Sequence, residues 1–184
     1  MMAYWPGKGL EQTEGTCKAA IQRAKELGIE HVVVASNTGR TARHFLDSGL
    51  HVAVITHHTG FKAPGHQEMT KEERRFLEDK GFDVLTTTHL FANIERAITN
   101  KSGGLYPGGI VSATLRAFGQ GTKVCFEIAT TALDAGLIPH GKEIMVVAGS
   151  GGGADTALVM IPAHAKDFFD TQVLEVVCKP RVPK

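Results

Sequence analysis

The chain has 184 residues, of which 42% are hydrophobic and 21% charged, and this size and composition suit one globular domain with its own core. Its formal net charge of +1 argues against nucleic-acid binding, which usually needs a basic excess. No apolar stretch approaches the roughly 20 residues that span a bilayer, and the three widely spaced cysteines indicate neither a disulfide framework nor a cysteine zinc site. We therefore expect a single cytoplasmic domain over residues 1–184, without nucleic-acid or membrane partners.

Short apolar runs rich in β-branched residues predict the strands. Their apolarity is continuous rather than alternating, which is typical of strands covered on both faces. In chain order the runs are 31–36, 52–56, 82–85, 144–148, 157–161 and 173–177. The run 82–85 is the weakest of them, and we expect 173–177 to add an edge strand to about five main strands.

Between these runs, apolar residues recur at the spacing of a helix. Thr70 and Glu73 have the spacing of a capping box, and Gly28 and Gly136 stand where a helix would stop. The predicted helical faces lie within 17–27, 70–77, 91–98, 111–118 and 125–135. We expect the glycine-rich stretch 101–109 to be a loop.

The alternation of strands and helices predicts an α/β fold with three layers, α/β/α, around a mostly parallel sheet. One connection is different, because only residues 149–156 join the strands 144–148 and 157–161. A parallel crossover needs a dozen or more residues. We therefore expect these two strands to be antiparallel neighbours.

Residues 35–42 (ASNTGRTA) form the first candidate site, since they follow a strand and are expected to open a helix. Hydroxyl and amide groups, a tight turn at Gly39 and the free N–H groups of a helix start attract anions. Arg40 or Arg43 would add positive charge. An ordinary strand-to-helix turn with an N-cap explains the same residues equally well.

Two further segments end strands of the same predicted sheet, where open α/β sheets bind ligands. Residues 149–155 (GSGGGAD) let the backbone approach a ligand closely, although a flexible hairpin loop has the same composition. Residues 56–61 (THHTGF) supply polar groups and Phe61, which would pack on a flat ligand or into the core. We interpret the histidines as a polar pocket wall and expect no metal, because adjacent side chains on extended backbone point to opposite sides.

No complete catalytic constellation is visible, since the chain has neither a Walker lysine motif nor a G-x-S-x-G elbow. His57, His58 and Asp155 are the only groups that we nominate for proton transfer. Glu127 and Asp134 lie on a predicted helix away from the candidate site, and we expect both to be solvated.

Two stretches resemble the C-terminal α/β domain of pyruvate kinase. Residues 31–56 (HVVVASNTGRTARHFLDSGLHVAVIT) resemble its strand, phosphate loop, helix and strand, and residues 132–163 resemble its closing segment. Over its whole length the chain resembles small, mostly archaeal proteins built on this domain alone. A (β/α)₈ barrel takes about 250 residues, so we do not expect pyruvate kinase activity of this chain.

The resemblance implies a phosphate loop at Ser36, Asn37, Thr38, Gly39 and Thr41, with residues 149–153 as the facing effector loop. It also implies flavin mononucleotide (FMN) as the ligand and a homo-oligomer as the assembly. This effector loop lacks the family's aromatic and arginine residues, which favours a monophosphate over a sugar bisphosphate.

We therefore expect a protein that binds a phosphorylated small molecule, FMN being one candidate. A flavin-dependent oxidoreductase is one alternative, and a structural or regulatory subunit without ligand is another. The expected binding residues are Ser36, Asn37, Thr38, Gly39, Arg40, Thr41, Thr56, His57, Thr59, Gly60, Phe61, Gly149, Ser150, Gly151, Gly152, Gly153 and Asp155.

Overall fold

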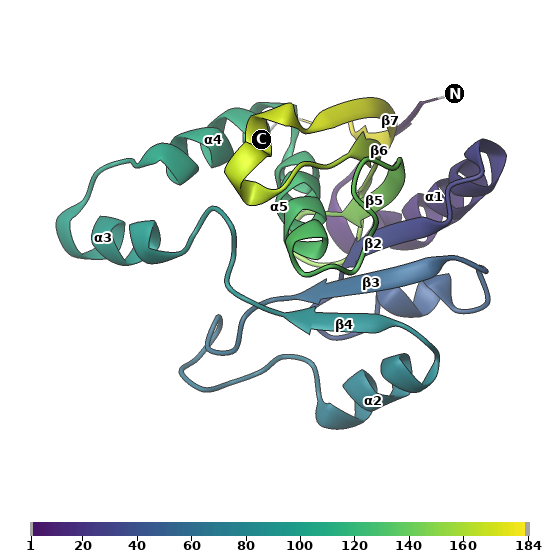
Figure 1. The fold of residues 1–184 in the computed structure, drawn as a ribbon, viewed down its shortest axis with the longest axis horizontal. Helices are drawn as coiled ribbons and strands as arrows, with labels where there is room; N and C mark the ends of the chain where they lie inside the picture. Colours follow the sequence, from purple (N-terminus) through teal and green to yellow (C-terminus); the bar gives the residue numbers. More distant parts are fainter. Residues whose placement is uncertain (1, 183–184) are drawn as a thin grey trace.

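A computed structural model describes residues 2–182 as a three-layer α/β/α domain around a seven-stranded sheet (Figure 1). The strands lie in the order β1-β7-β6-β5-β2-β3-β4. Their bounds are β1 (Ala3–Trp5), β2 (His31–Ala35), β3 (His51–Thr56), β4 (Asp83–Thr86), β5 (Ile144–Ala148), β6 (Thr156–Ile161) and β7 (Gln172–Pro180). The expected fold class is confirmed.

The sheet is parallel except at β6, which runs antiparallel to both of its neighbours, β5 and β7. The short connection between β5 and β6 is closed by a hydrogen bond from the Asp155 N–H to the Ala148 carbonyl at 3.0 Å. The predicted antiparallel pair is therefore confirmed, because the connection is too short for a crossover.

The sheet has one more strand than the six predicted runs. The prediction that β7 is an edge strand is wrong, because the three-residue strand β1 pairs with it in parallel. The pairing runs from Ala3 opposite Cys178 to Trp5 opposite Pro180. A strand of three residues has no periodicity to read, so the sequence offered no sign of it.

Each face of the sheet is covered by helices that bury a separate core. α1 (Thr13–Leu27) and α2 (Lys71–Asp79) lie on one face, and α5 (Gln120–Asp134) lies on the other (Figure 1). Alternate residues of β2 serve the two cores, since Val32 and Val34 pack towards α1 and Val33 towards α5. This explains the continuous apolarity of the strands.

The predicted capping box is confirmed in part. The Thr70 hydroxyl, at the N-cap of α2, accepts a hydrogen bond from the Glu73 N–H at 3.1 Å. The Glu73 carboxylate does not return the contact to Thr70, because it pairs with Arg43 at 2.6 Å.

All three cysteines are buried and free, and within residues 2–182 no helix is long and apolar enough to cross a membrane.

Residues 94–118 form an arm that projects from the domain (Figure 1). It consists of α3 (Ile94–Ser102), α4 (Pro107–Leu115) and the 3₁₀ turn η3 (Arg116–Phe118). Two predictions fail here. The expected loop 101–109 is shorter than predicted and comprises only residues 103–106, because α3 runs to Ser102 and Pro107 starts α4 at a position where proline is favoured. The expected apolar face is not buried either, since Ile94 is 73% exposed and Ile98 is 40% exposed.

Leu77 attaches α2 to the sheet and is completely buried. We expect Leu77→Ala to lower the free energy of unfolding by about 2–5 kcal/mol, because the substitution removes buried methyl groups and leaves a cavity. Urea denaturation monitored by circular dichroism measures this. Leu27→Ala is the matched control, because Leu27 is 40% exposed. Equal losses in the two variants would contradict the assigned packing of α2.

Candidate functional site

A cavity of about 1050 Å³ lies at the carboxyl ends of the parallel strands β2, β3 and β5. The loops that follow these strands line it, together with residues 87–89 after β4, the start of α1 and one side of α5. Its volume is at the upper end of the range for small-molecule pockets, about 300–1000 Å³. Open α/β sheets bind ligands at this edge.

Most of the predicted binding residues meet at this cavity. Those that line it are Ser36, Asn37, Thr38, Arg40, Thr41, Thr56, His57, Phe61, Gly149, Gly151, Gly152 and Gly153. Five others are not part of the lining: Gly39, Thr59, Gly60, Ser150 and Asp155. The three predicted segments are therefore brought together, although not every residue of each segment faces the cavity.

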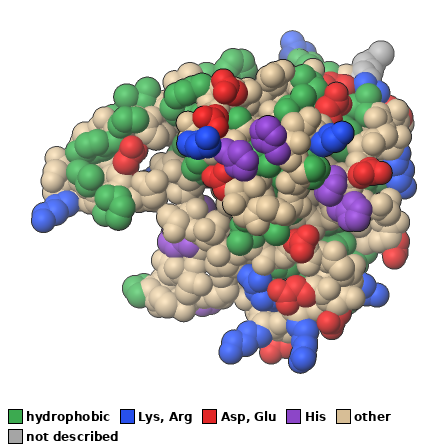
Figure 2. Space-filling view, viewed as in Figure 1, with side chains coloured by type: hydrophobic (Ala, Val, Ile, Leu, Met, Phe, Trp, Pro, Cys, Tyr) green, Lys and Arg blue, Asp and Glu red, His purple; other side chains and the backbone are tan. Residues whose placement is uncertain are grey.

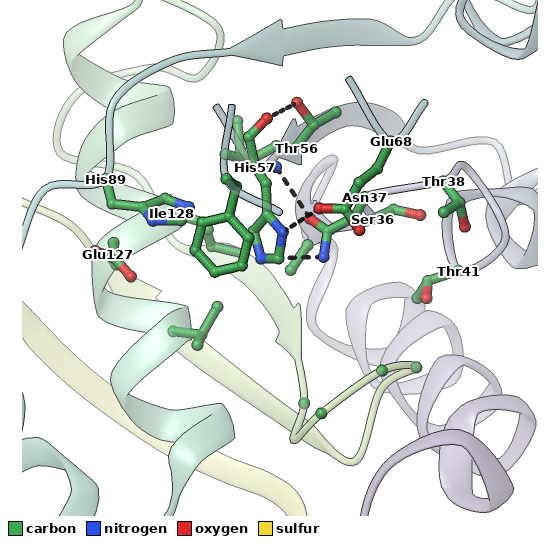
Figure 3. A pocket seen from close by; sticks show the side chains of 18 of the residues that line it. Ser36, Asn37, Thr38, Thr41, Thr56, His57, Glu68, His89, Glu127 and Ile128 are labelled. Carbon is green, nitrogen blue, oxygen red and sulfur yellow. Dashed lines mark hydrogen bonds and ion pairs between the residues drawn. The ribbon is translucent and has the colours of Figure 1, made fainter. Parts of the chain in front are cut away.

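The loop 36–41 does not open a long helix, contrary to the prediction. Only the four-residue 3₁₀ turn η2 (Ala42–Phe45) follows it, and Leu46 is already extended. No hydrogen bond to an acceptor within residues 2–182 uses the backbone N–H groups of residues 37–41. Five consecutive donors without a partner, beside the Thr38 and Thr41 hydroxyls on one side of the cavity, suit an anion (Figure 3).

Two residues of this loop region have structural roles. Gly39 has φ +86°, and a Cβ atom there would overlap the Glu73 side chain. Arg43, a predicted source of positive charge, is held by Glu73 through contacts of 2.8 and 2.6 Å. Arg40 alone among the predicted arginines faces the cavity.

A hydrogen-bond chain runs from Asn37 through His57 to Glu68 (Figure 3). The Asn37 Oδ1 accepts from the His57 backbone N–H at 3.0 Å, so its Nδ2 is the group that faces His57 Nε2 at 3.1 Å. Because Nδ2 can only donate, Nε2 accepts and the imidazole proton lies on Nδ1, 2.6 Å from Glu68 Oε2.

Glu68 is itself paired with Lys62 at 2.7 Å. Burial alone would raise the pKa of Glu68, but the hydrogen bonds from Lys62 and His57 outweigh it and the pKa is lowered. The middle of the cavity wall therefore carries a neutralised carboxylate and a histidine whose tautomer is set by its partners.

Aromatic rings border the hydrogen-bond chain of Asn37, His57 and Glu68. The His57 and Phe61 ring centroids lie 3.8 Å apart at 32°, and His89 meets both rings edge-on at 5.2 Å. His58 also contacts Phe61 and His89. His89, which follows the weak strand β4, lines the cavity but is not among the predicted binding residues. Because the ends of parallel strands meet at one edge of the sheet, the position of His89 after β4 could have identified it as a residue of the site.

Burial lowers the pKa of His89 to about 4, against the opposing effect of the Glu127 carboxylate. Electrostatic interaction with His57, His58 and Lys123 lowers the pKa of His89 further. His89 is therefore neutral at pH 7.

The glycine loop 149–153 is held from behind by a buried carboxylate. Asp155 Oδ2 accepts from the Gly9 N–H at 2.8 Å and the Ser150 N–H at 3.1 Å, and its Oδ1 accepts from the Thr156 hydroxyl at 2.8 Å. Asp155 is completely buried. It shapes the loop from outside the cavity, which is not the ligand contact that the sequence suggested.

The N–H groups of Gly151, Gly152 and Gly153 have no acceptor within the described part of the chain. All three residues line the cavity. They add backbone donors on a second side of the space beside the loop 36–41.

Lys123 and Glu127, on α5, form an ion pair inside the cavity wall, and each is 6% exposed. The prediction that Glu127 is solvated is therefore wrong, whereas Asp134 is exposed as expected. Glu127 Oε1 also accepts from the Phe91 N–H at 3.1 Å. Burial lowers the pKa of Lys123, although Glu127 opposes this.

Within residues 2–182, no group of three or more His, Cys, Asp and Glu side chains is arranged to hold a metal ion.

The sheet order and the cavity define an open α/β domain with a ligand pocket at the carboxyl ends of its strands. The family model described as pyruvate kinase, alpha/beta domain, matches residues 14–160 of the 184-residue chain. The match begins in α1 and ends in β6, so it includes every strand that borders the cavity. The chain therefore belongs to the pyruvate kinase alpha/beta domain family.

His89 should make folding stability depend on pH. Its pKa is about 4 in the folded protein and 6.5 ordinarily, so between these values the unfolded chain binds a proton that the folded chain does not. Stability is then lost as the pH falls from 6.5 towards 4, by on the order of 2–3 kcal/mol. Urea unfolding at several pH values should show a smaller loss in His89→Gln than in wild type.

His66→Gln is the control, because His66 is exposed. An acid-induced loss of the same size in His89→Gln as in wild type would show that His89 is not the responsible group.

Proposed function

We propose that this protein binds a phosphorylated small molecule, with the phosphate on the loop 36–41. The observation that carries the proposal is the run of backbone N–H groups at residues 37–41 that have no acceptor within the described residues 2–182. Successive backbone donors form concave anion sites in phosphate-binding proteins. The hydroxyls of Thr38 and Thr41 and the backbone donors of the glycine loop supply further hydrogen bonds.

The remainder of the cavity suits a flat, partly apolar group. Phe61 and His89 offer ring faces and edges, while Ile55 and Ile128 add apolar surface. FMN combines a phosphate with such a ring, and the residues present suit both parts. We therefore propose FMN as the first ligand to test. When bound, a flavin would supply electron-transfer chemistry.

The first experiment is to purify the protein without added ligand, denature it and analyse the supernatant by mass spectrometry and visible absorbance. We expect a phosphorylated compound in a fixed ratio to protein, with flavin absorbance if it is FMN. If no such compound is released, and neither FMN nor inorganic phosphate shifts the melting temperature, the proposal is wrong.

Substitutions that place a carboxylate beside the phosphate should weaken binding. We expect Thr38→Glu and Gly151→Glu to lower the affinity for FMN or inorganic phosphate about tenfold or more, because like charges repel at short range. Isothermal titration calorimetry measures this.

Thr114→Glu and Gly136→Glu are the matched controls, because both positions are exposed and outside this cavity. Gly136 and Gly151 also share φ values near +70° and open space around the missing Cβ. Equal affinities in the test and control variants would contradict the assignment of the phosphate site to these loops.

We also propose that the arm is a contact between copies of this chain. Ile94, Leu105, Ile110 and Phe118 are all more than half exposed on it, and Figure 2 shows hydrophobic side chains gathered along the arm. Contiguous exposed apolar surface is typical of interaction sites.

Leu105→Lys should convert an oligomer into a smaller species, because a buried ammonium group is unfavourable at an apolar contact. Light scattering coupled to size-exclusion chromatography measures the mass. Leu174→Lys, at an exposed position on β7, should leave the mass unchanged. A wild-type protein that is monomeric at high concentration would contradict the proposal.

A further inference from the structure

Three cations gather at one end of the cavity, and no predicted binding residue lies there. Arg96 comes from α3, Arg116 from η3 and Lys123 from α5, and all three line the cavity. Arg116 is hydrogen-bonded to Gln120, about one turn before Lys123 on α5, and Arg96 follows closely on Phe91, whose N–H binds Glu127. The charges of Arg116 and Arg96 accordingly contribute to lowering the pKa of Lys123.

This end carries more positive than negative charge. Glu127 neutralises Lys123, and its other oxygen is occupied by the Phe91 N–H. Neither Arg96 nor Arg116 has an acidic partner within residues 2–182. Two guanidinium groups are thus left to face the cavity without a counter-ion.

Arg116 is also oriented. Its Nε donates to Gln120 Oε1 at 2.8 Å and its Nη1 donates to Ser112 Oγ at 2.6 Å. These two bonds fix the plane of the guanidinium group and leave other N–H groups for a ligand. A planar, pre-oriented guanidinium is suited to a carboxylate or phosphate.

The other acids of the cavity do not balance these arginines. Glu68 is paired with Lys62, and Glu14 with Lys18 at 2.6 Å. Glu11 lies in the turn Gly9–Gln12, which packs against the glycine loop.

The two anion-attracting regions lie on opposite sides of the cavity. Figure 3 shows Glu127 and His89 on one side and Thr38 and Thr41 on the other, with His57 between them. The arginines belong to the Glu127 side, because Arg116 is bonded to Gln120 on the same helix and Arg96 follows closely on Phe91, whose N–H Glu127 accepts.

We infer that the cavity takes a ligand with two anionic ends, a phosphate on the loop 36–41 and a carboxylate or second phosphate on Arg96 and Arg116. This inference rests on the proposed phosphate site and adds the chemical class of the ligand that the cavity binds. The aromatic rings of His57, Phe61 and His89 would contact the segment between the two ends.

The test uses alkyl phosphates of increasing chain length whose far end is a methyl group, a carboxylate or a second phosphate. At the best length we expect the far anion to raise the affinity about 10- to 100-fold over the methyl compound, as charge-assisted hydrogen bonds do. Comparing carboxylate with phosphate identifies which anion the arginines prefer. Calorimetry at fixed ionic strength measures each affinity.

Arg96→Gln and Arg116→Gln should each remove most of this gain without changing the affinity for the methyl compounds. Arg75→Gln, on the exposed surface of α2, is the matched control. Arg96 is exposed, so its variant is expected to fold, and a melting curve checks both. Thr38→Glu should weaken all three series together.

The outcomes separate the two proposals. If methyl-ended phosphates bind but a far anion adds nothing at any length, or the gain survives both arginine substitutions, this inference fails and the phosphate site stands. If no series binds, both fail.

Discussion

The buried carboxylate of Asp155 is the interaction on which the shape of this domain depends most. It joins the turn before α1, the glycine loop and the start of β6 through three hydrogen bonds. An ionised carboxylate removed from water is costly unless such donors surround it. The N-terminal end of α5 also approaches it, since a Cβ atom at Gly121 would lie 2.9 Å from Asp155 Oδ1, and the positive end of a helix favours a negative charge.

This one group links parts of the chain that are far apart in sequence. The turn before α1 and the first residue of α1 lie so close to the glycine loop that a Cβ atom at Gly153 would overlap Leu10 and Thr13. The Thr13 hydroxyl then accepts from the Ala154 N–H at 2.9 Å. The glycine loop therefore has a defined shape, and Gly151, Gly152 and Gly153, whose N–H groups have no acceptor within residues 2–182, line the cavity.

The electrostatics of the cavity follow from how its charges are paired. In the middle, Glu68 is neutralised by Lys62 and accepts a hydrogen bond from His57, and His89 is kept neutral mainly by burial. At the two ends, within residues 2–182, the backbone donors of the loops have no acceptor and the two arginines have no acidic partner. A weakly charged middle between anion-attracting ends is the basis of the ligand class that we propose.

The sequence by itself determined the layers of the fold and the edge of the sheet where the loops meet. Continuous apolar runs such as 31–36 are local patterns, and the short connection after β5 allows only an antiparallel neighbour. It also located the loops 36–41 and 149–153, because residues that end parallel strands necessarily share one edge.

Only the tertiary structure decided which polar side chains face that edge. Lys123 and Glu127 have the spacing of an ordinary surface ion pair, and they are buried because the segment around Phe91 and the sheet enclose α5. Arg96 joins the cavity through the placement of the arm, and Asp155 is turned away from it by donors as distant in sequence as Gly9. Periodicity records the relation of a residue to its near neighbours, whereas burial and charge pairing depend on segments that meet only in the folded chain.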